Sequence, residues 1–130
     1  SILNIKLKNY KKVIHKRNFL AKTYFKELKN LNEIKLYNLR SKNLSTFHQF
    51  VIRTELRDQL KSYLLKNGIE TMIHYPYMLN ELGFFKDKKK LNKSYKLGQK
   101  ILSLPISEEH SKKEAIYVAR SIKNFFSKRS

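Results

Sequence analysis

Residues 68–76 read Gly68-Ile69-Glu70-Thr71-Met72-Ile73-His74-Tyr75-Pro76, and the rest of the chain can be interpreted outward from them. Glycine tolerates the left-handed conformation that ends many helices, so Gly68 predicts the end of a helix. The β-branched and apolar residues after it predict a strand over Ile69–Tyr75. Pro76 then restricts the backbone of a turn. His74 and Tyr75 therefore lie where a strand meets a loop, and from such a position side chains reach into clefts.

The sequence before this stretch predicts a long helix, a hairpin and a second helix. Apolar residues recur every three or four positions over residues 9–31, the spacing of one helix face. Residues 34–39 alternate in polarity and residues 47–54 are rich in aromatic and β-branched side chains, so both predict strands. A short polar turn joins them, which favours an antiparallel hairpin. Thr54 is a suitable cap for a helix over Glu55–Lys66.

The sequence after the stretch predicts a long loop followed by two more helices. Residues 76–90 form the predicted loop, and residues 91–102 the next helix. Residues 104–106 predict an extended crossing, and Ser111 with Glu114 has the spacing of a capping box that opens the final helix. The predicted fold is α/β (α+β), with a small, mainly antiparallel three-stranded sheet covered by helices. Residues 1–130 are interpreted as a single domain.

Composition excludes several classes of site. The chain has no cysteine, so disulfides, thiolate catalysis and cysteine-bound metals are excluded. Histidines and carboxylates do not occur at metal-ligand spacing, so no metal site is predicted. Glycines are scattered singly, without a phosphate-binding loop, and no nucleophile elbow surrounds a serine. No apolar run is long enough for a membrane span, and the predicted location is the cytoplasm.

The net charge of +19 raises the question of a nucleic-acid partner. The excess is carried by 23 lysines against 6 arginines, and Asn and Ile occur 11 times each while Ala and Gly occur 3 times each. The abundant residues Lys, Asn and Ile have A/T-rich codons, whereas Ala, Gly and most Arg codons are G/C-rich. The base composition of the gene therefore accounts for most of the positive charge. Arginine, the better bidentate reader of phosphates and bases, is not enriched. Nucleic acid is therefore the less favoured partner.

The remaining ionisable candidates are individual histidines and one arginine. His15 and His110 are interpreted as surface residues, and His48 as a half-buried residue at the edge of a strand. Arg53 ends a predicted strand, where it can pair with a neighbouring domain or bind an anionic group. His74 differs from the other histidines because it lies at the mouth of the long loop.

A series of short motifs occurs in a fixed order along the chain. The motifs are Phe50-Val51-Ile52-Arg53, Arg57-Asp58-x-Leu60, Tyr63-Leu64-x-x-x-Gly68-Ile69, Thr71-x-Ile73-His74-Tyr75-Pro76, Leu102-Ser103-Leu104-Pro105-Ile106, and Tyr117-Val118 through Ile122-x-x-Phe125-Phe126. Together they resemble the C-terminal part of the DegT/DnrJ/StrS family of pyridoxal-phosphate-dependent nucleotide-sugar aminotransferases. Two departures are Tyr77-Met78-Leu79-Asn80, where the family often has Pro-Leu-His-like residues, and Ser107, where an aromatic residue is common.

The resemblance implies a fold-type-I architecture, with a large domain whose mixed sheet holds the cofactor and a smaller C-terminal domain. It implies a homodimer that transfers an amino group from glutamate to a nucleotide-linked keto sugar, for O-antigen or other polysaccharide biosynthesis. The Schiff-base lysine of such enzymes lies in the large domain. The resemblance therefore assigns no catalytic residue to this chain and implies that the chain alone neither binds pyridoxal phosphate nor transaminates. It places His74 and Tyr75 on the substrate side of the cleft between domains.

Three further expectations follow. Because the chain starts at Ser1 without an initiator methionine, we expect it to be a piece of a longer protein, and the resemblance implies that this piece is the small C-terminal domain. The first alternative function is a basic nucleic-acid-binding module, whose affinity would fall steeply with salt. The second is a standalone interaction domain that uses the exposed side of the first helix.

Overall fold

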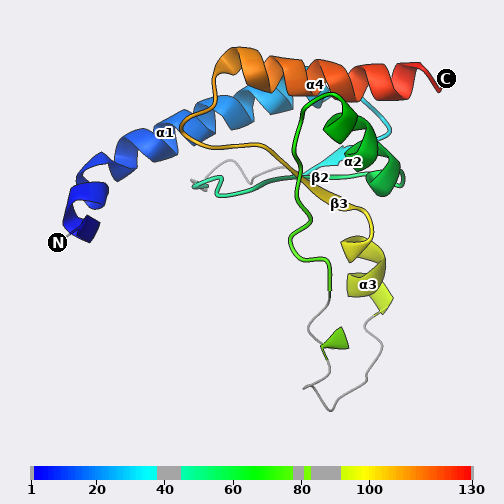
Figure 1. Ribbon diagram of the computed structural model, residues 1–130, viewed down its shortest axis with the longest axis horizontal. Helices are drawn as coiled ribbons and strands as arrows, with labels where there is room; N and C mark the ends of the chain where they lie inside the picture. Colours follow the sequence, from blue (N-terminus) through cyan, green and yellow to red (C-terminus); the bar gives the residue numbers. More distant parts are fainter. Residues whose placement is uncertain (1, 38–44, 78–80, 83–91, 130) are drawn as a thin grey trace.

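The computed structural model describes residues 2–37, 45–77, 81–82 and 92–129. The elements in chain order are α1 (Ile2–Leu28), β1 (Lys35–Leu36), β2 (Phe50–Arg53), α2 (Arg57–Lys66), α3 (Asn92–Gly98), β3 (Ile101–Leu104) and α4 (Lys112–Ser127). Figure 1 shows α1 and α4 lying side by side over one face of the sheet, while α3 lies on the other side. None of the described helices combines the length and apolarity that crossing a membrane requires.

The sheet has the order β1-β2-β3 with antiparallel pairing throughout, so the predicted hairpin and the predicted sheet type are confirmed. Residues directly opposite each other share a face of the sheet. The inner face, which the helices cover, carries Leu36, Phe50, Ile52, Leu102 and Leu104. The outer face carries Lys35, Val51, Arg53, Ile101 and Ser103.

The third strand is not the predicted one. The strand expected over Ile69–Tyr75 makes only an isolated bridge, in which Met72 and Ser103 exchange two backbone hydrogen bonds of 3.2 and 2.8 Å. The strand beside β2 is instead β3 (Ile101–Leu104), part of which was predicted to end a helix. The periodicity of apolar residues indicates whether a segment is extended. It does not indicate which of several extended segments will pair with a strand that is distant in the sequence.

The core lies between the inner face and the helices. The apolar stripe of α4 is buried as predicted, and its members are Ala115, Val118, Ala119, Ile122, Phe125 and Phe126. Among the side chains of α1 whose burial the structure describes, the buried apolar ones lie in the C-terminal half and are Leu20, Ala21, Tyr24 and Leu28. This helix begins at Ile2 rather than near residue 9, and Figure 1 shows its N-terminal half projecting beyond the other elements.

The end of α2 confirms the interpretation of Gly68. Its φ is +72°, a left-handed value, and its N–H donates to the carbonyl of Leu65 at 3.0 Å. The N–H of Ile69 donates to the carbonyl of Leu64 at 2.9 Å. These are the two hydrogen bonds of a Schellman motif, and the apolar residue after the glycine is buried against the same core as Leu64.

Other predicted boundaries are shifted or lie outside the described residues. The N-cap of α2 is Leu56 rather than Thr54, whose hydroxyl instead accepts the N–H of Leu56 at 3.3 Å in the preceding turn. β1 spans two of the residues predicted over 34–39, of which 38 and 39 lie outside the described residues. Most of the predicted loop over 76–90 also lies outside them.

The capping box of α4 is formed as predicted. The Ser111 N–H donates to Glu114 Oε2 at 2.6 Å, and the Glu114 N–H donates to Ser111 Oγ at 3.2 Å. The hydrogen bond from the Ser111 N–H, followed by that from its hydroxyl, lowers the pKa of the Glu114 carboxyl. The ionised carboxylate therefore favours the folded state.

This lowered pKa predicts how stability depends on pH. Because the folded pKa lies below the unfolded one, the contribution is present above about pH 4.3 and is lost as the pH falls through the folded pKa. We expect Glu114→Gln to lower the free energy of unfolding at pH 7, and the difference from wild type to vanish toward pH 3. Urea unfolding at both pH values measures this. A difference that persists at the lower pH would contradict it, and exposed Glu109→Gln is the control.

Candidate functional site

His74 lies on the outer face of the sheet, where it is held by a residue of β3. Its Nδ1 is 2.9 Å from Ser103 Oγ. Ser103 is 6% exposed, because it lies between Val51 of β2 and the bridging Met72. A hydroxyl bound to one ring nitrogen orients the imidazole and leaves the other nitrogen, Nε2, for a ligand. Nε2 makes no hydrogen bond within the described part of the chain.

Tyr75 follows His74 through a cis peptide bond and is largely exposed. The two rings meet edge to face, with centroids 5.8 Å apart and an interplanar angle of 85°. The structure therefore brings together the two residues expected to line the substrate side. An imidazole nitrogen and a phenol, side by side at a surface, suit the hydroxyl groups of a polar ligand.

Ser103 was not identified as a candidate from the sequence. The available signal was a single hydroxyl within the otherwise apolar strand Ile101-Leu102-Ser103-Leu104. A hydroxyl buried in a strand requires a hydrogen-bond partner. That requirement predicts a neighbour, but it does not say that the neighbour is a histidine 29 residues earlier in the chain.

Two cations share the outer face with His74. Lys35 of β1 is opposite Arg53 of β2, which in turn is opposite Ile101 of β3. Within the described residues neither side chain donates a hydrogen bond or forms an ion pair. The nearby carboxylate Glu55 is already bound by Lys100 at 2.6 Å, and this hydrogen bond is the main cause that lowers the pKa of Glu55. We call Lys35 and Arg53 the cation pair.

An aromatic groove of about 410 Å³ adjoins the cation pair. Its lining residues are Phe25, Tyr37, Ser45, Phe47, Gln49, Phe50, Val51, Leu97 and Ile101. Tyr37 and Leu97 are 49% and 38% exposed, so apolar surface remains open to solvent at the rim. The floor of the groove is aromatic, with the centroids of the Phe25 and Phe47 rings 6.2 Å apart and an interplanar angle of 67°.

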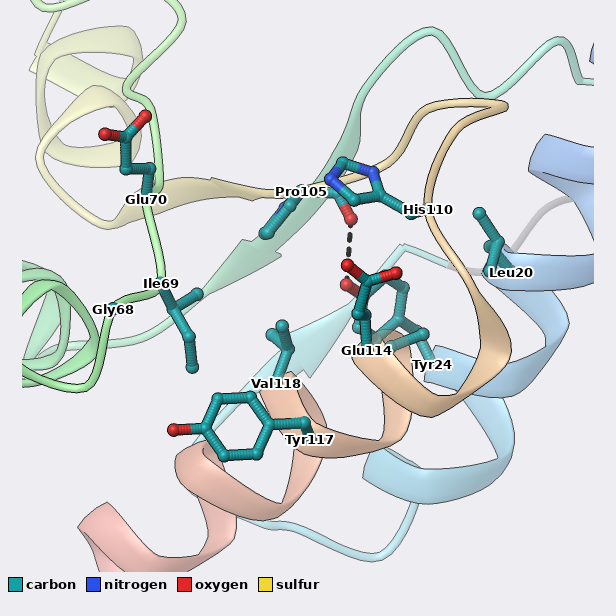
Figure 2. A pocket seen from close by; sticks show the side chains of 11 residues that line it. Leu20, Tyr24, Gly68, Ile69, Glu70, Pro105, His110, Glu114, Tyr117 and Val118 are labelled. Carbon is teal, nitrogen blue, oxygen red and sulfur yellow. Dashed lines mark hydrogen bonds between the residues drawn. The ribbon is translucent and has the colours of Figure 1, made fainter.

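A second cavity, of about 320 Å³, lies beside the helices (Figure 2). Its apolar wall includes Leu20, Ile69 and Val118, and its rim carries carboxylates. Figure 2 shows the Tyr24 hydroxyl donating to the Pro105 carbonyl, a hydrogen bond of 2.8 Å. Burial raises the pKa of Tyr24, so its hydroxyl remains a neutral donor.

The polar groups of this second cavity mainly hold the chain in place. His110 was expected to be a plain surface residue, but it is half-buried and its Nδ1 accepts the Ser107 N–H at 3.0 Å. Glu114 is occupied by the capping box. His15 is exposed as expected, whereas His48 is exposed and precedes β2 rather than lying at a half-buried strand edge.

The described residues do not make up a pyridoxal-phosphate site. A Schiff-base lysine needs a desolvated amine or one beside another cation. No described lysine is buried, and the amines of Lys100 and Lys123 are bound by Glu55 and Glu27. The same described residues contain no group of three or more His, Asp or Glu that could hold a metal ion.

The model of the DegT/DnrJ/EryC1/StrS aminotransferase family matches residues 1–123. The chain belongs to this family. The resemblance carried by the ordered motifs is thereby confirmed. The family depends on pyridoxal phosphate.

Two similar proteins and one solved structure define the relation further. The chain is 31% identical to the erythromycin biosynthesis sensory transduction protein EryC1 of Saccharopolyspora erythraea, over 95% of this chain and 35% of that protein. It is 28% identical to the dTDP-3-amino-3,4,6-trideoxy-alpha-D-glucose transaminase of Streptomyces venezuelae, over 96% of this chain and 34% of that one. A crystal structure of DesV from S. venezuelae superposes with a TM-score of 0.86, at 28% identity, over 95% of this chain and 34% of that one.

These comparisons confirm the fold class, and they show how much of each relative's length the chain covers. The same fold recurs in the crystal structure of a DegT DnrJ EryC1 StrS aminotransferase from Brucella abortus, with a TM-score of 0.85 at 29% identity over 95% of this chain and 34% of that one. The chain spans about a third of the length of the curated relatives it matches.

Proposed function

We propose that the chain is the small, C-terminal domain of an aminotransferase that moves an amino group from glutamate to a keto sugar carried on a nucleotide. Family membership supports this proposal, as do relatives named as transaminases of dTDP- and UDP-linked sugars. The proposal includes pyridoxal phosphate bound by residues outside this chain, a homodimer, a cytoplasmic location and a role in polysaccharide biosynthesis.

The observation that carries the proposal for the site is the contact between His74 and Ser103. A histidine fixed through Nδ1 at a strand edge presents Nε2 at a constant position. We propose that His74 and Tyr75 hydrogen-bond the sugar, or the carboxylate of the amino donor, when substrate binds. Their task is then to bind and orient substrate, and proton transfer at the reacting carbon belongs to groups outside this chain.

The proposal predicts the kinetics of His74 variants in the full-length product of the reading frame that encodes this chain. We expect His74→Ala to raise KM for the nucleotide sugar about tenfold, the loss of one hydrogen bond of about 1.4 kcal/mol, with a smaller change in kcat. Conversion of glutamate to 2-oxoglutarate, followed at several sugar concentrations, measures both constants.

Two matched variants separate binding from positioning. Asn places an amide near Nδ1 of histidine and keeps the contact with Ser103, whereas Gln reaches further, toward Nε2. We expect His74→Gln to recover more affinity for the sugar than His74→Asn. His15→Ala, on an exposed part of α1, is the control and is expected to leave KM unchanged. Equal KM values for wild type and His74→Ala would exclude His74 from the substrate site.

A further inference from the structure

We propose that Ser103 is a positioning residue that makes His74 a hydrogen-bond donor: its hydroxyl donates to Nδ1 and so keeps the proton of the neutral imidazole on Nε2. This inference rests on the proposed function and deepens it, because it names the kind of ligand atom that His74 recognises. That atom is an oxygen that accepts a hydrogen bond, as in a carboxylate, carbonyl or phosphoryl group, and not an N–H group.

The position of Ser103 is fixed from both sides of β3. On one side it is directly opposite Val51 of β2. On the other side its N–H donates to the Met72 carbonyl at 2.8 Å, and its carbonyl accepts the Met72 N–H at 3.2 Å. Side chains alternate along a strand, and Leu102 and Leu104 are buried on the inner face, so the Ser103 hydroxyl lies on the outer face. Because both backbone groups are engaged with Met72, the hydroxyl is the group of Ser103 that is available to a side chain.

The surroundings of this hydroxyl decide the direction of its hydrogen bond. Ser103 is buried, and within the described ranges His74 Nδ1, at 2.9 Å, is the only partner of its Oγ. Val51, its neighbour on β2, has no polar atom in its side chain. If Nδ1 carried the proton and donated to Oγ, the hydroxyl proton would be buried without an acceptor, which is costly. The hydroxyl therefore donates, and Nδ1 accepts.

The direction of this bond decides what His74 offers to a ligand. A neutral imidazole has one N–H, so an accepting Nδ1 leaves the proton on Nε2. His74 is half-buried, and its Nε2 makes no hydrogen bond within the described part of the chain. An unpartnered N–H in this position favours a ligand that brings an oxygen acceptor. Both proposed substrates carry such oxygens: the amino donor in its carboxylates, and the sugar nucleotide in its carbonyl and phosphates.

Magic-angle-spinning nitrogen-15 NMR of the histidine-labelled full-length protein, without substrate, shows which ring nitrogen carries the proton. At about pH 8.5 imidazoles are ordinarily neutral, and the signals of His74 are those that the His74→Gln variant lacks. We expect wild type to hold the Nε2–H tautomer in at least about tenfold excess, and Ser103→Ala to hold a mixture of both tautomers. A proton on Nδ1 in wild type would overturn the inference, as would an unchanged tautomer ratio in Ser103→Ala.

Two isosteric variants separate the hydroxyl from the shape of the side chain. Thr keeps the hydroxyl and Val replaces it with a methyl group, and both β-branched residues suit a strand. We expect Ser103→Thr to keep the wild-type tautomer ratio and Ser103→Val to resemble Ser103→Ala. Equal ratios in the Thr and Val variants would contradict a role for the hydroxyl. Circular dichroism shows whether each variant is folded, and the smaller Ser103→Ala remains the test if a larger side chain prevents folding.

The matched control is Ser121→Ala on α4. This substitution removes a hydroxyl from a serine that is 6% exposed, the same exposed fraction as for Ser103. We expect it to change neither the tautomer ratio of His74 nor KM for either substrate. A shift of the tautomer ratio equal to that in Ser103→Ala would show a general response to lost hydroxyls and would reject the assignment.

A double-mutant cycle in the full-length protein separates a positioning role from a structural one. We expect Ser103→Ala to raise KM about threefold for the same substrate that His74→Ala affects, with a smaller change in kcat. In the His74→Ala background we expect no further effect of Ser103→Ala, because the hydroxyl acts through the imidazole. The same loss in both backgrounds would reject the positioning role. The substrate whose KM rises, sugar nucleotide or glutamate, is the one that supplies the acceptor oxygen.

The two proposals fail in different measurements. The tautomer is measured without turnover, so a proton on Nδ1 in a protein that transaminates would reject the role of Ser103 alone. The expected tautomer ratios in a full-length protein that does not transaminate would reject the proposed function alone.

Discussion

The Tyr24→Ala substitution is expected to lower the free energy of unfolding by about 3–5 kcal/mol, the range for truncating a large aromatic residue in a core. Tyr24 is 1% exposed and its ring lies 4.9 Å from that of Phe50, at the junction of α1 with the inner face of the sheet. Truncation leaves a cavity and also removes the donor to the Pro105 carbonyl. Since domains are stable by only about 5–15 kcal/mol, much of the total is lost.

Two matched variants separate the contribution of the Tyr24 hydroxyl from that of its buried ring. Tyr24→Phe keeps the ring and removes only the hydroxyl, so we expect a loss of about 1 kcal/mol. Tyr10→Ala truncates the same side chain on the same helix where it is 44% exposed, and we expect a change of about 0.5 kcal/mol or less. Urea unfolding followed by circular dichroism measures all three. Similar losses for Tyr24→Ala and Tyr10→Ala would contradict the packing of α1 against the sheet.

The Leu102→Ala substitution is expected to cost about 2–5 kcal/mol of stability. Leu102 is 0% exposed and is opposite Ile52, so its side chain lies at the centre of the inner face. The cost follows from lost apolar contact and from a cavity that neighbouring strands cannot close. The same unfolding measurement gives the difference from wild type.

Met72→Ala is the matched control for Leu102→Ala. Met72 lies in the segment that the sequence alone predicted to be the third strand, yet it is 61% exposed and makes a single bridge. We expect its truncation to change the free energy of unfolding by about 0.5 kcal/mol or less. A loss for Met72→Ala as large as that for Leu102→Ala would contradict the assignment of β3 as the strand beside β2.

Local signals in the sequence predicted the ends of helices and the buried face of α4. A glycine at residue 68 and the Ser111–Glu114 pair act within a single turn of chain, so their geometry follows from neighbouring residues alone. The stripe of α4 is likewise set by a period of 3.6 residues. The ordered motifs also indicate the family without any knowledge of the structure, since the order and spacing of residues are properties of the sequence itself.

The sequence by itself thus determined most of the helices, the first two strands, the sheet type and the family, and it singled out His74 and Tyr75. Only the tertiary structure decided which segment pairs with β2, and hence that Ser103 holds His74 across a separation of 29 residues. It also decided that Lys35 and Arg53 lie opposite each other on the outer face of the sheet. The physical reason is that propensity and periodicity act over a few residues, whereas strand pairing depends on burying apolar surface between segments distant in the chain.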